Sequence, residues 1–363
     1  MPDHHDKTVL VAMSGGVDSS VALLLLKRQG YSVAGATMKL WDYRDVGGDR
    51  SAGGGCCNLN SINDARAVCD GLGVPHYVFD FSGRFREAVI ENFVAEYRAG
   101  RTPNPCIICN SILKWQTFLE QAAKIGCEYI ATGHYARSGY DGVIGRYFIR
   151  RGIDPTRDQS YALWGISQEA LSRTILPLGE LAKVETRRIA AEAGLKTARV
   201  AESMEICFVA DDDYERFIRE YSSAPIPPGE IVDRAGRKVG VHKGIPFYTI
   251  GQRKGLGIAH PTPLYVVDID SAHNRIVIGD KEDLDRRDMT VSKVNWVSIT
   301  PPQGPFSCQV KIRYQHQAAP AEIAATADGR LRVAFDHPQR AITPGQSAVL
   351  YDGDTVLAGG VID

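Results

Sequence analysis

The stretch Ser14-Gly-Gly-Val-Asp-Ser-Ser20 constrains the fold of this chain more than any other. It follows the apolar run Thr8–Met13 and opens the helical run Val21–Gln29, so it predicts a strand, a tight glycine turn and a helix N-terminus. The first N–H groups of a helix lack backbone partners and bind anions. Because Gly15 and Gly16 have no Cβ and can take positive φ, a phosphate can approach them closely. The stretch therefore predicts a phosphate site.

Two better-known phosphate motifs are absent from this stretch: the Lys-Ser/Thr of the kinase-type loop and the dinucleotide pattern G-x-G-x-x-G. Ser14, Ser19 and Ser20 add hydroxyl donors, whereas Asp18 would repel a bare phosphate and predicts a bridging Mg²⁺ ion. The pattern resembles the pyrophosphate-binding loop of the PP-loop ATPases. That resemblance implies that ATP is cut at its α-phosphate to adenylate a substrate oxygen.

Composition narrows the class of protein. The chain has 363 residues, 44% of them hydrophobic, which predicts two or three globular domains. Its longest aliphatic run, Val21–Leu26, is too short to span a bilayer, so we expect a cytoplasmic protein without a membrane partner. Eight cysteines are too few for a disulfide scaffold and predict buried, catalytic or metal-binding roles. A net charge of −1 argues against a generally basic nucleic-acid binder, but not against a local basic patch.

The order of elements predicts three domains. Strands alternate with helices over the first part, which predicts an α/β fold with a doubly wound parallel sheet over residues 1–206. Short alternating strands with glycine and proline turns predict a small β-rich domain over 207–283. Six strands over 284–363 predict a C-terminal β-barrel. We expect a linker over 280–288 and a mobile loop over the site at 41–60.

Two thiols lie in a proline-stiffened segment. Cys106 and Cys109 are expected in a loop and at the start of the helix Ser111–Lys124, where the helix dipole favours thiolate. This position suits nucleophilic or metal-ligand roles. Cysteines within helix or strand runs are expected to pack in cores; these are Cys69, Cys127 and Cys308.

Several separated motifs, taken together, resemble the bacterial tRNA-specific 2-thiouridylases of the MnmA type. They occur in the same order along nearly the whole chain, at residues 14–20, 102–110, 133–135, 157–160, 205–208, 251–257, 313–314 and 344–346. The resemblance implies ATP-dependent replacement of O2 by sulfur on the wobble uridine of tRNA, with release of AMP and pyrophosphate. It also implies a sulfur-carrier protein or cysteine desulfurase as the donor.

The resemblance assigns roles to particular residues. It makes Cys109 the nucleophile and Cys207 the carrier of the persulfide. It places ATP against Ala12, Met13, Ser14, Gly15, Gly16, Val17, Asp18, Ser19, Met38 and Gly133. It places tRNA against Asn104, Pro105, His134, Arg157, Asp158, Gln159, Arg313, Tyr314 and Gln346, with Asn104 to Cys106 near the target base.

One residue departs from the family pattern. Many members have aspartate where this chain has Cys106, and a thiolate prefers a metal whereas a carboxylate moves protons. Cys106, Cys109 and Cys207 are therefore hypothesised to hold a [4Fe–4S] cluster, which we favour over a persulfide–disulfide route. A zinc site of Cys56, Cys57, Cys106 and Cys109 ranks below both, because adjacent cysteines fit tetrahedral geometry poorly.

Other functions remain open on the sequence. The same loop occurs in adenylating ligases that deliver nitrogen, and a non-catalytic tRNA-binding module is a second alternative. Met38 and His134 also have ordinary structural interpretations, in core packing and hydrogen bonding respectively. The arginines at 146, 150, 151 and 157 predict either a phosphate-binding face or a solvated charged face.

Overall fold

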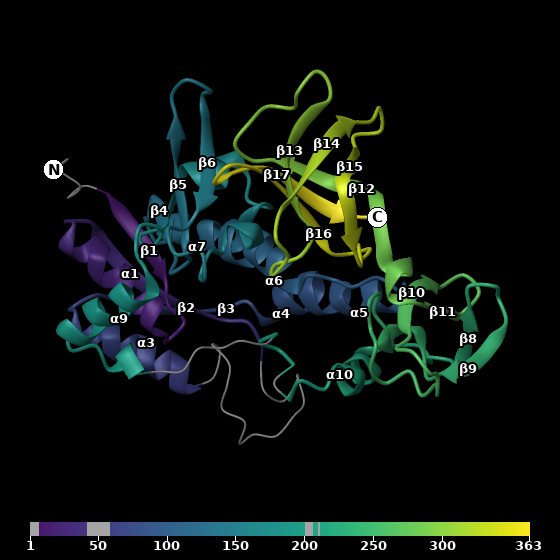
Figure 1. Ribbon diagram of the computed structural model, residues 1–363. Helices are drawn as coiled ribbons and strands as arrows, with labels where there is room; N and C mark the ends of the chain where they lie inside the picture. Colours follow the sequence, from purple (N-terminus) through teal and green to yellow (C-terminus); the bar gives the residue numbers. More distant parts are fainter. Residues whose placement is uncertain (1–6, 42–58, 200–205, 210) are drawn as a thin grey trace.

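The computed structural model describes residues 7–41, 59–199, 206–209 and 211–363. It contains three sheets. Figure 1 shows the parallel sheet at one end, the smallest sheet at the other end, and the barrel above the helices that lie between them. The loop expected over 41–60 lies almost wholly outside the described residues, as do Cys56, Cys57 and Glu205. Within the described ranges, no helix has the length and hydropathy that a membrane crossing requires.

The N-terminal sheet is fully parallel, as the sequence predicts, with the strand order β3-β2-β1-β4-β7. Its strands are β1 (Thr8–Ala12), β2 (Ser32–Lys39), β3 (His76–Asp80), β4 (Tyr129–Ala131) and β7 (Thr174–Ile175). The central strand β1 is buried on both faces, so it is a continuous apolar run rather than an alternating one.

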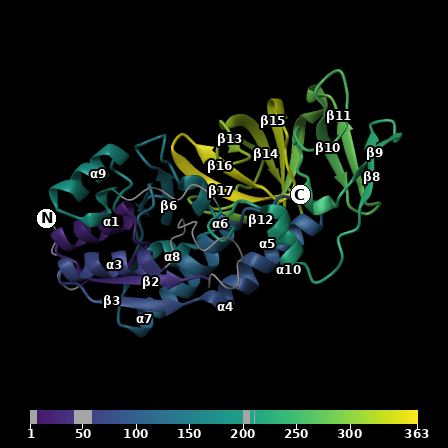
Figure 2. The same cartoon turned by 90° about the horizontal axis from the view of Figure 1, so that it is seen from below.

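Helices cover both faces of this sheet, and alternate residues of β1 supply the two cores. Val9 and Val11 pack with residues of one helical layer, which contains α1 (Val17–Arg28), α3 (Leu59–Gly71) and α9 (Lys183–Glu192). Leu10 and Ala12 pack in the core of the other layer, formed by α4 (Ser82–Phe85), η1 (Arg86–Ile90), α5 (Glu91–Arg98) and a long helical rod described next. Figure 2 shows α1 and α9 on one side of the sheet and α4 and α7 on the other.

That helical rod begins earlier than predicted. It consists of α6 (Pro105–Ile108), the π-helix η2 (Cys109–Thr117) and α7 (Phe118–Lys124) without a break. The loop expected before Ser111 is therefore wrong: Pro105 occupies the first helical position, where its missing N–H costs no hydrogen bond. Cys106 and Cys109 consequently lie within the first turns of the rod.

Short elements connect this layer to the rest of the chain. They are β5 (Ala136–Asp141), β6 (Arg146–Arg151), η3 (Ser160–Leu163), α8 (Gln168–Ser172), η4 (Lys196–Arg199) and α10 (Tyr214–Tyr221). The central β-rich sheet has the order β10-β11-β8-β9. Its elements are β8 (Gly229–Asp233), β9 (Lys238–His242), η5 (Ile245–Phe247), β10 (Tyr265–Asp270) and β11 (Arg275–Gly279).

The linker expected over 280–288 is wrong. A capping box at Asp280 and Asp283 begins the short helix η6 (Lys281–Leu284), and Asp285 already begins β12. The acidic residues of this stretch thus cap a helix instead of forming an unstructured connection.

Six antiparallel strands form the predicted barrel. They are β12 (Asp285–Trp296), β13 (Phe306–Lys311), β14 (Ala319–Ala325), β15 (Leu331–Arg340), β16 (Ser347–Asp352) and β17 (Thr355–Ile362). Pairing of β12 with both β15 and β17 closes the ring. The hairpin β5–β6 of the N-terminal part joins the outside of this ring, where Arg150 pairs with Thr355. This junction was not predicted from the sequence.

The barrel packs tightly against the N-terminal part. Gly359 of β17 lies against Trp164, and a Cβ added to Gly359 would lie 2.4 Å from Cγ of that ring. Asn295 donates hydrogen bonds to the carbonyls of Trp164 and Ile166, at 2.6 and 3.0 Å. Glycine is required at this point because a larger residue would push the two parts of the molecule apart.

Replacing this glycine tests the interface. We expect Gly359→Ala to lower the free energy of unfolding by about 1–3 kcal/mol, since the buried indole of Trp164 must shift to admit a methyl group. The matched control is Gly304→Ala, whose added Cβ would meet nothing within 4 Å. Urea denaturation of both variants measures the difference, and equal stability would contradict the proposed close packing.

Candidate nucleotide and thiol site

The glycine turn between β1 and α1 has the form that the sequence predicts, with one refinement. Gly15 has φ +75°, and a Cβ there would lie 2.5 Å from the carbonyl oxygen of Ser61. Gly16, the N-cap of α1, has φ −91°, which any residue adopts. Only Gly15 therefore uses the left-handed region, while Gly16 leaves the helix start without a side-chain cap.

The serine hydroxyls of this turn are not equivalent. Ser19 Oγ accepts from the backbone N–H of Ser14 at 3.2 Å and donates to the carbonyl of Gly16 at 3.2 Å. Ser20 Oγ donates to that same carbonyl at 2.8 Å, and its side chain is fully buried. Ser14 and Ser19 line the pocket described below, whereas Ser20 braces the helix and does not reach it.

Gly133, directly after β4, lies against the first turn of α1. A Cβ at this position would lie 2.8 Å from both the carbonyl carbon of Asp18 and the backbone nitrogen of Ser19. Only glycine permits this approach, which packs the segment after β4 on the start of α1 at the carboxyl edge of the sheet. In an open α/β sheet, this edge is where ligands bind.

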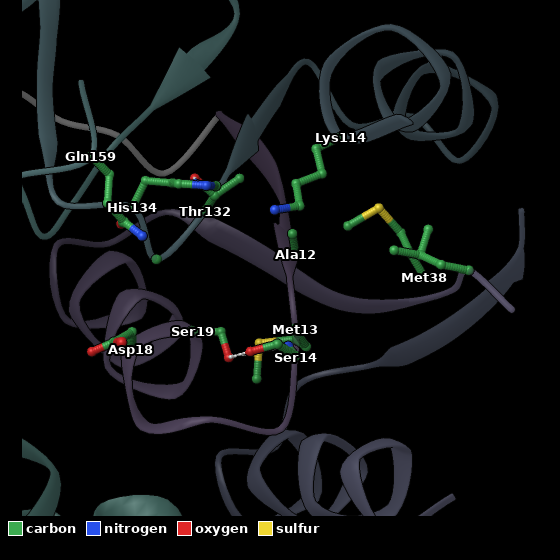
Figure 3. Close-up of a pocket in the computed structure, with 12 residues that line it drawn as sticks. Ala12, Met13, Ser14, Asp18, Ser19, Met38, Lys114, Thr132, His134 and Gln159 are labelled. Atoms are coloured by element: carbon green, nitrogen blue, oxygen red, sulfur yellow. Dashed lines mark hydrogen bonds between the residues drawn. The ribbon is translucent and has the colours of Figure 1, made fainter. Parts of the chain in front are cut away.

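A pocket of about 200 Å³ opens at this edge (Figure 3). It is lined by Ala12, Met13, Ser14, Asp18, Ser19, Met38, Leu40, Lys114, Thr132, Gly133, His134 and Gln159. Seven predicted ATP contacts are thus gathered around one cavity. Gly15, Gly16 and Val17 shape the turn without lining the pocket, and Met38 lies on the wall opposite His134 (Figure 3).

Asp18 is engaged by protein groups in this structure. Both carboxylate oxygens accept from Lys183 Nζ at 2.8 Å, and Oδ1 also accepts from the hydroxyl of Tyr135 at 2.7 Å. Thr186 Oγ1 lies 2.9 Å from that hydroxyl, so α1, α9 and the segment between β4 and β5 form one polar network. A Mg²⁺ ion would share these carboxylate oxygens with Lys183 and Tyr135, and Asp18 as its ligand stays a prediction.

His134 lies in the pocket wall and is held neutral. Its Nδ1 lies 2.7 Å from Thr132 Oγ1, and its ring centroid lies 5.4 Å from that of Trp115. Removal from water and the nearby Lys114 ammonium lower the pKa of His134 well below its usual value. Its neutral ring and the side chain of Gln159 both face the nucleotide pocket, although the resemblance had placed these two residues against tRNA.

The two predicted sulfur-transfer cysteines belong to one apolar cluster. Cys109 is a buried member of the larger core of the N-terminal part, and half-buried Cys207 packs against that core. Cys106, by contrast, is exposed. Cys109 and Cys207 thus contact the same apolar core despite their wide separation in sequence, and their approach for sulfur transfer stays a prediction.

These thiols do not fit the predicted iron–sulfur cluster. Within the described ranges, no three or more His, Cys, Asp and Glu side chains gather as a metal site would require. Cys106, Cys109 and Cys207 all lie in those ranges, so the three-thiol arrangement is not supported. The zinc alternative rests on Cys56 and Cys57, which lie outside them.

The segment before the rod is fastened to the barrel. Gln346 donates its amide to the carbonyls of Thr102 and Pro103 at 3.1 and 3.2 Å, and Thr102 N–H donates to the carbonyl of Pro344 at 2.8 Å. Gly345 has φ +90°, and its Cβ would lie 2.9 Å from Thr102 backbone atoms. Gln346, a predicted tRNA contact, here holds the segment that leads to Cys106.

The remaining predicted tRNA residues converge from two domains. Tyr314 donates its hydroxyl to the carbonyl of Asp158 at 3.1 Å, which joins the two sequence segments 157–159 and 313–314. The carboxylate of Asp158 accepts from Gly152 and Ser160. Arg313 donates to the carbonyls at 340 and 341, at 3.3 and 3.4 Å. Direct contact of these side chains with tRNA stays a prediction, as it does for Asn104, Pro105 and Arg157.

Comparison with known proteins decides the family. Three family models match in succession: "tRNA methyl transferase HUP domain" over residues 7–211, "tRNA methyl transferase PRC-barrel domain" over 215–280 and "Aminomethyltransferase beta-barrel domain" over 286–362. A tRNA-specific 2-thiouridylase MnmA of Clostridioides difficile is 47% identical over 358 residues, covering 99% of this chain and 98% of the relative. The chain belongs to the tRNA-specific 2-thiouridylase family.

Other comparisons agree with this assignment. The 2-thiouridylase MnmA of Moorella thermoacetica is 49% identical over 356 residues, covering 98% of this chain and 99% of the relative. Two of the family models are described as methyl transferase domains, whereas the relatives are 2-thiouridylases. The relatives decide the family because they match this chain nearly end to end. A solved 4-thiouridine synthetase–RNA complex with bound ATP has a TM-score of 0.34 at 15% identity, covering 56% of this chain and 45% of that chain. That likeness is too distant to support a conclusion here.

Three cysteines of this thiouridylase are structural, as predicted. Burial raises the pKa of Cys69 and of Cys308 to about 12, and it also raises that of Cys127. All three thiols thus stay protonated at neutral pH and pack as small apolar groups.

Sequence reasoning missed Lys114, Thr132, Leu40 and Lys183. Thr132 and Leu40 could have been predicted. Each lies at the carboxyl end of a predicted strand, next to a predicted ATP contact, and ligands bind at that edge of the sheet. The sequence carries no local signal for the two lysines, since each reaches the site from a helix whose position only packing decides.

Removing the Lys183 charge tests the Asp18 network. We expect Lys183→Met to weaken ATP binding about tenfold, because an uncompensated Asp18 carboxylate then faces the phosphates. Adding Asp18→Asn to that variant is expected to restore most of the affinity, and calorimetric titration measures both. The control is Lys196→Met on the exposed surface. Equal ATP affinity in the Lys183→Met variant and the wild type would contradict the network's role.

The neutral state of His134 predicts a pH dependence. Its pKa is depressed in the folded protein, so the unfolded chain takes up a proton below about pH 6.5 that the folded chain does not. Stability should therefore fall as pH drops from 7.5 to 5.5, and His134→Asn should lose about 1 kcal/mol less over that range. Urea denaturation at both pH values measures this, and parallel losses in variant and wild type would refute it.

Proposed function

We propose that this chain is a tRNA-uridine 2-sulfurtransferase that adenylates O2 of the wobble uridine and then exchanges that oxygen for sulfur. The observation that carries the proposal is the placement of Cys109 and Cys207 in one apolar cluster of the domain whose Gly15–Ser19 turn forms the phosphate site. Near end-to-end similarity to thiouridylases supports the same activity.

The first half-reaction uses the pocket. The start of α1 and the hydroxyls of Ser14 and Ser19 suit the phosphates of ATP, while Met38 and Leu40 offer an apolar wall for the adenosine. Attack of the uridine oxygen on the α-phosphorus releases pyrophosphate and leaves C2 carrying a good leaving group. Mg²⁺ would assist by neutralising the phosphates, and Asp18 is the residue proposed to hold it.

The second half-reaction uses the two thiols. The terminal sulfur of a persulfide on Cys207 attacks C2 and AMP leaves, which links the uridine to Cys207 through two sulfur atoms. The thiolate of Cys109 then attacks Sγ of Cys207, so that 2-thiouridine leaves and a Cys109–Cys207 disulfide forms. A dithiol reductant must reopen that disulfide. This persulfide route replaces the cluster hypothesis because the thiols do not gather as cluster ligands.

Contact with tRNA and delivery of sulfur by a donor protein are further parts of this proposal. The face that joins 157–159 to 313–314 is proposed to contact tRNA, since basic and aromatic side chains meet there. A sulfur-carrier protein or cysteine desulfurase would load Cys207, and the reaction would take place in the cytoplasm. The thiouridylase relatives favour this scheme over nitrogen ligation and over a non-catalytic tRNA-binding module.

Separate assays of the half-reactions test the proposal. We expect Cys109→Ser and Cys207→Ser each to abolish 2-thiouridine formation, because each removes a sulfur that the transfer needs. Both should still release pyrophosphate from ATP in a single turnover with tRNA, at a rate within about threefold of the wild type. Mass spectrometry of the wobble nucleoside and a pyrophosphate-release assay provide the two readouts.

The control variant is Cys308→Ala in the barrel core, which should keep both activities. If either serine variant still formed 2-thiouridine at the wild-type rate, the two-thiol scheme would be wrong. If the wild type released pyrophosphate without any change in the nucleoside mass, a nitrogen-delivering ligase would replace it.

A further inference from the structure

Lys114 reaches the nucleotide pocket from the helix that begins with Cys109. Its half-buried side chain leaves η2 and extends toward Ala12, with Thr132 and His134 on one side and Met38 on the other (Figure 3). Ser14 and Ser19 lie on the facing wall, where the start of α1 suits the terminal phosphates. The ammonium thus lies between the predicted pyrophosphate end and the predicted adenosine end.

The π-helical geometry sets this position. In a π-helix each N–H bonds to the carbonyl five residues earlier, as Phe118 N–H does to the carbonyl of Leu113. Cys109 and Lys114 are five residues apart, which is the spacing that one π-helical hydrogen bond spans. In an ordinary α-helix, residues five apart lie on different sides, because five residues exceed its turn. The wider π-helical turn reduces this rotation, so η2 sets the direction in which Lys114 leaves the rod.

Neighbouring side chains fix the helix in this rotation. Leu113 and Trp115 flank Lys114 and are 0% and 1% exposed. Trp115 also donates its indole N–H to Thr174 Oγ1 at 2.9 Å, which ties η2 to β7. With both flanking residues anchored in the core, the lysine between them is directed at the pocket instead of at open solvent (Figure 3).

Charges around the pocket favour an anion next to Lys114. The Asp18 carboxylate is compensated by Lys183, and His134 is neutral. Among the described residues that line the pocket, Lys114 is therefore the one whose side chain carries a positive charge at neutral pH. A partly desolvated ammonium interacts with a phosphate more strongly than one in bulk water.

We propose that Lys114 is a further catalytic residue, whose ammonium binds the non-bridging oxygens of the α-phosphate of ATP and stabilises their charge during adenylation. This inference rests on the proposed function. The bond between uridine O2 and the α-phosphorus forms while the bond from that phosphorus to the bridging oxygen breaks. Pyrophosphate leaves with the electron pair, and the uridine N3 proton passes to solvent. Lys114 keeps its protons throughout and acts by charge alone.

Charge removal at constant shape tests this assignment. Lys114→Met keeps an unbranched side chain without the ammonium, and Lys114→Arg keeps the charge. We expect Lys114→Met to lower kcat for tRNA-dependent pyrophosphate release by about 100-fold. The Kd for ATP should change less than about fivefold, since the terminal phosphates keep their contacts with the turn. Lys114→Arg should recover at least about tenfold of the lost rate.

The control is Lys124→Met, which removes an exposed charge from the end of the same rod and should keep the wild-type rate. A wild-type kcat in Lys114→Met would overturn the inference. So would a loss of rate that Lys114→Arg does not relieve while both variants melt at the wild-type temperature. Failure of the proposed function is distinguishable, because the wild type itself would then either release no pyrophosphate with tRNA or leave the mass of the wobble nucleoside unchanged.

Discussion

The close approach of Gly133 to the first turn of α1 is the constraint on which the pocket depends. β1 and β4 are paired in the sheet, and the segment after β4 packs on the start of α1 because no Cβ separates Gly133 from Asp18 and Ser19. This contact turns a sheet edge into a cavity with the unsatisfied N–H groups of a helix on one wall. Any larger residue at 133 would displace α1, and with it the hydroxyls of Ser14 and Ser19.

The negative charge of the Asp18 carboxylate is compensated by protein groups before a ligand binds. Lys183 from α9 compensates Asp18, and Tyr135 adds a hydrogen bond to the same carboxylate. A lone carboxylate at this position would repel the phosphates that the helix start attracts. Because His134 is neutral, it too adds no charge, so the groups that would attract an anion are the N–H dipoles of α1 and the ammonium of Lys114.

The barrel is part of the site although it lies outside the parallel sheet. The segment before Cys106 is hydrogen-bonded to Gln346, and Tyr161 donates its hydroxyl to the carbonyl of Ser347 at 2.8 Å. These contacts hold the thiol-bearing rod against the face where 157–159 meet 313–314. A tRNA bound across both parts would thus contact the element that positions Cys106 and Cys109, which links binding to the chemistry.

The parallel sheet, the phosphate turn, the barrel strands and the motif residues could be predicted from the chain alone, because period, glycine placement and local spacing act over short stretches. Three features became visible with the folded protein: Asp18 is paired with Lys183, Gln346 braces the segment at 102–103, and Lys114 enters the pocket. It also showed that Cys106, Cys109 and Cys207 do not gather into a cluster. Such contacts join residues far apart in the chain, and their geometry follows from packing between elements, which no local pattern encodes.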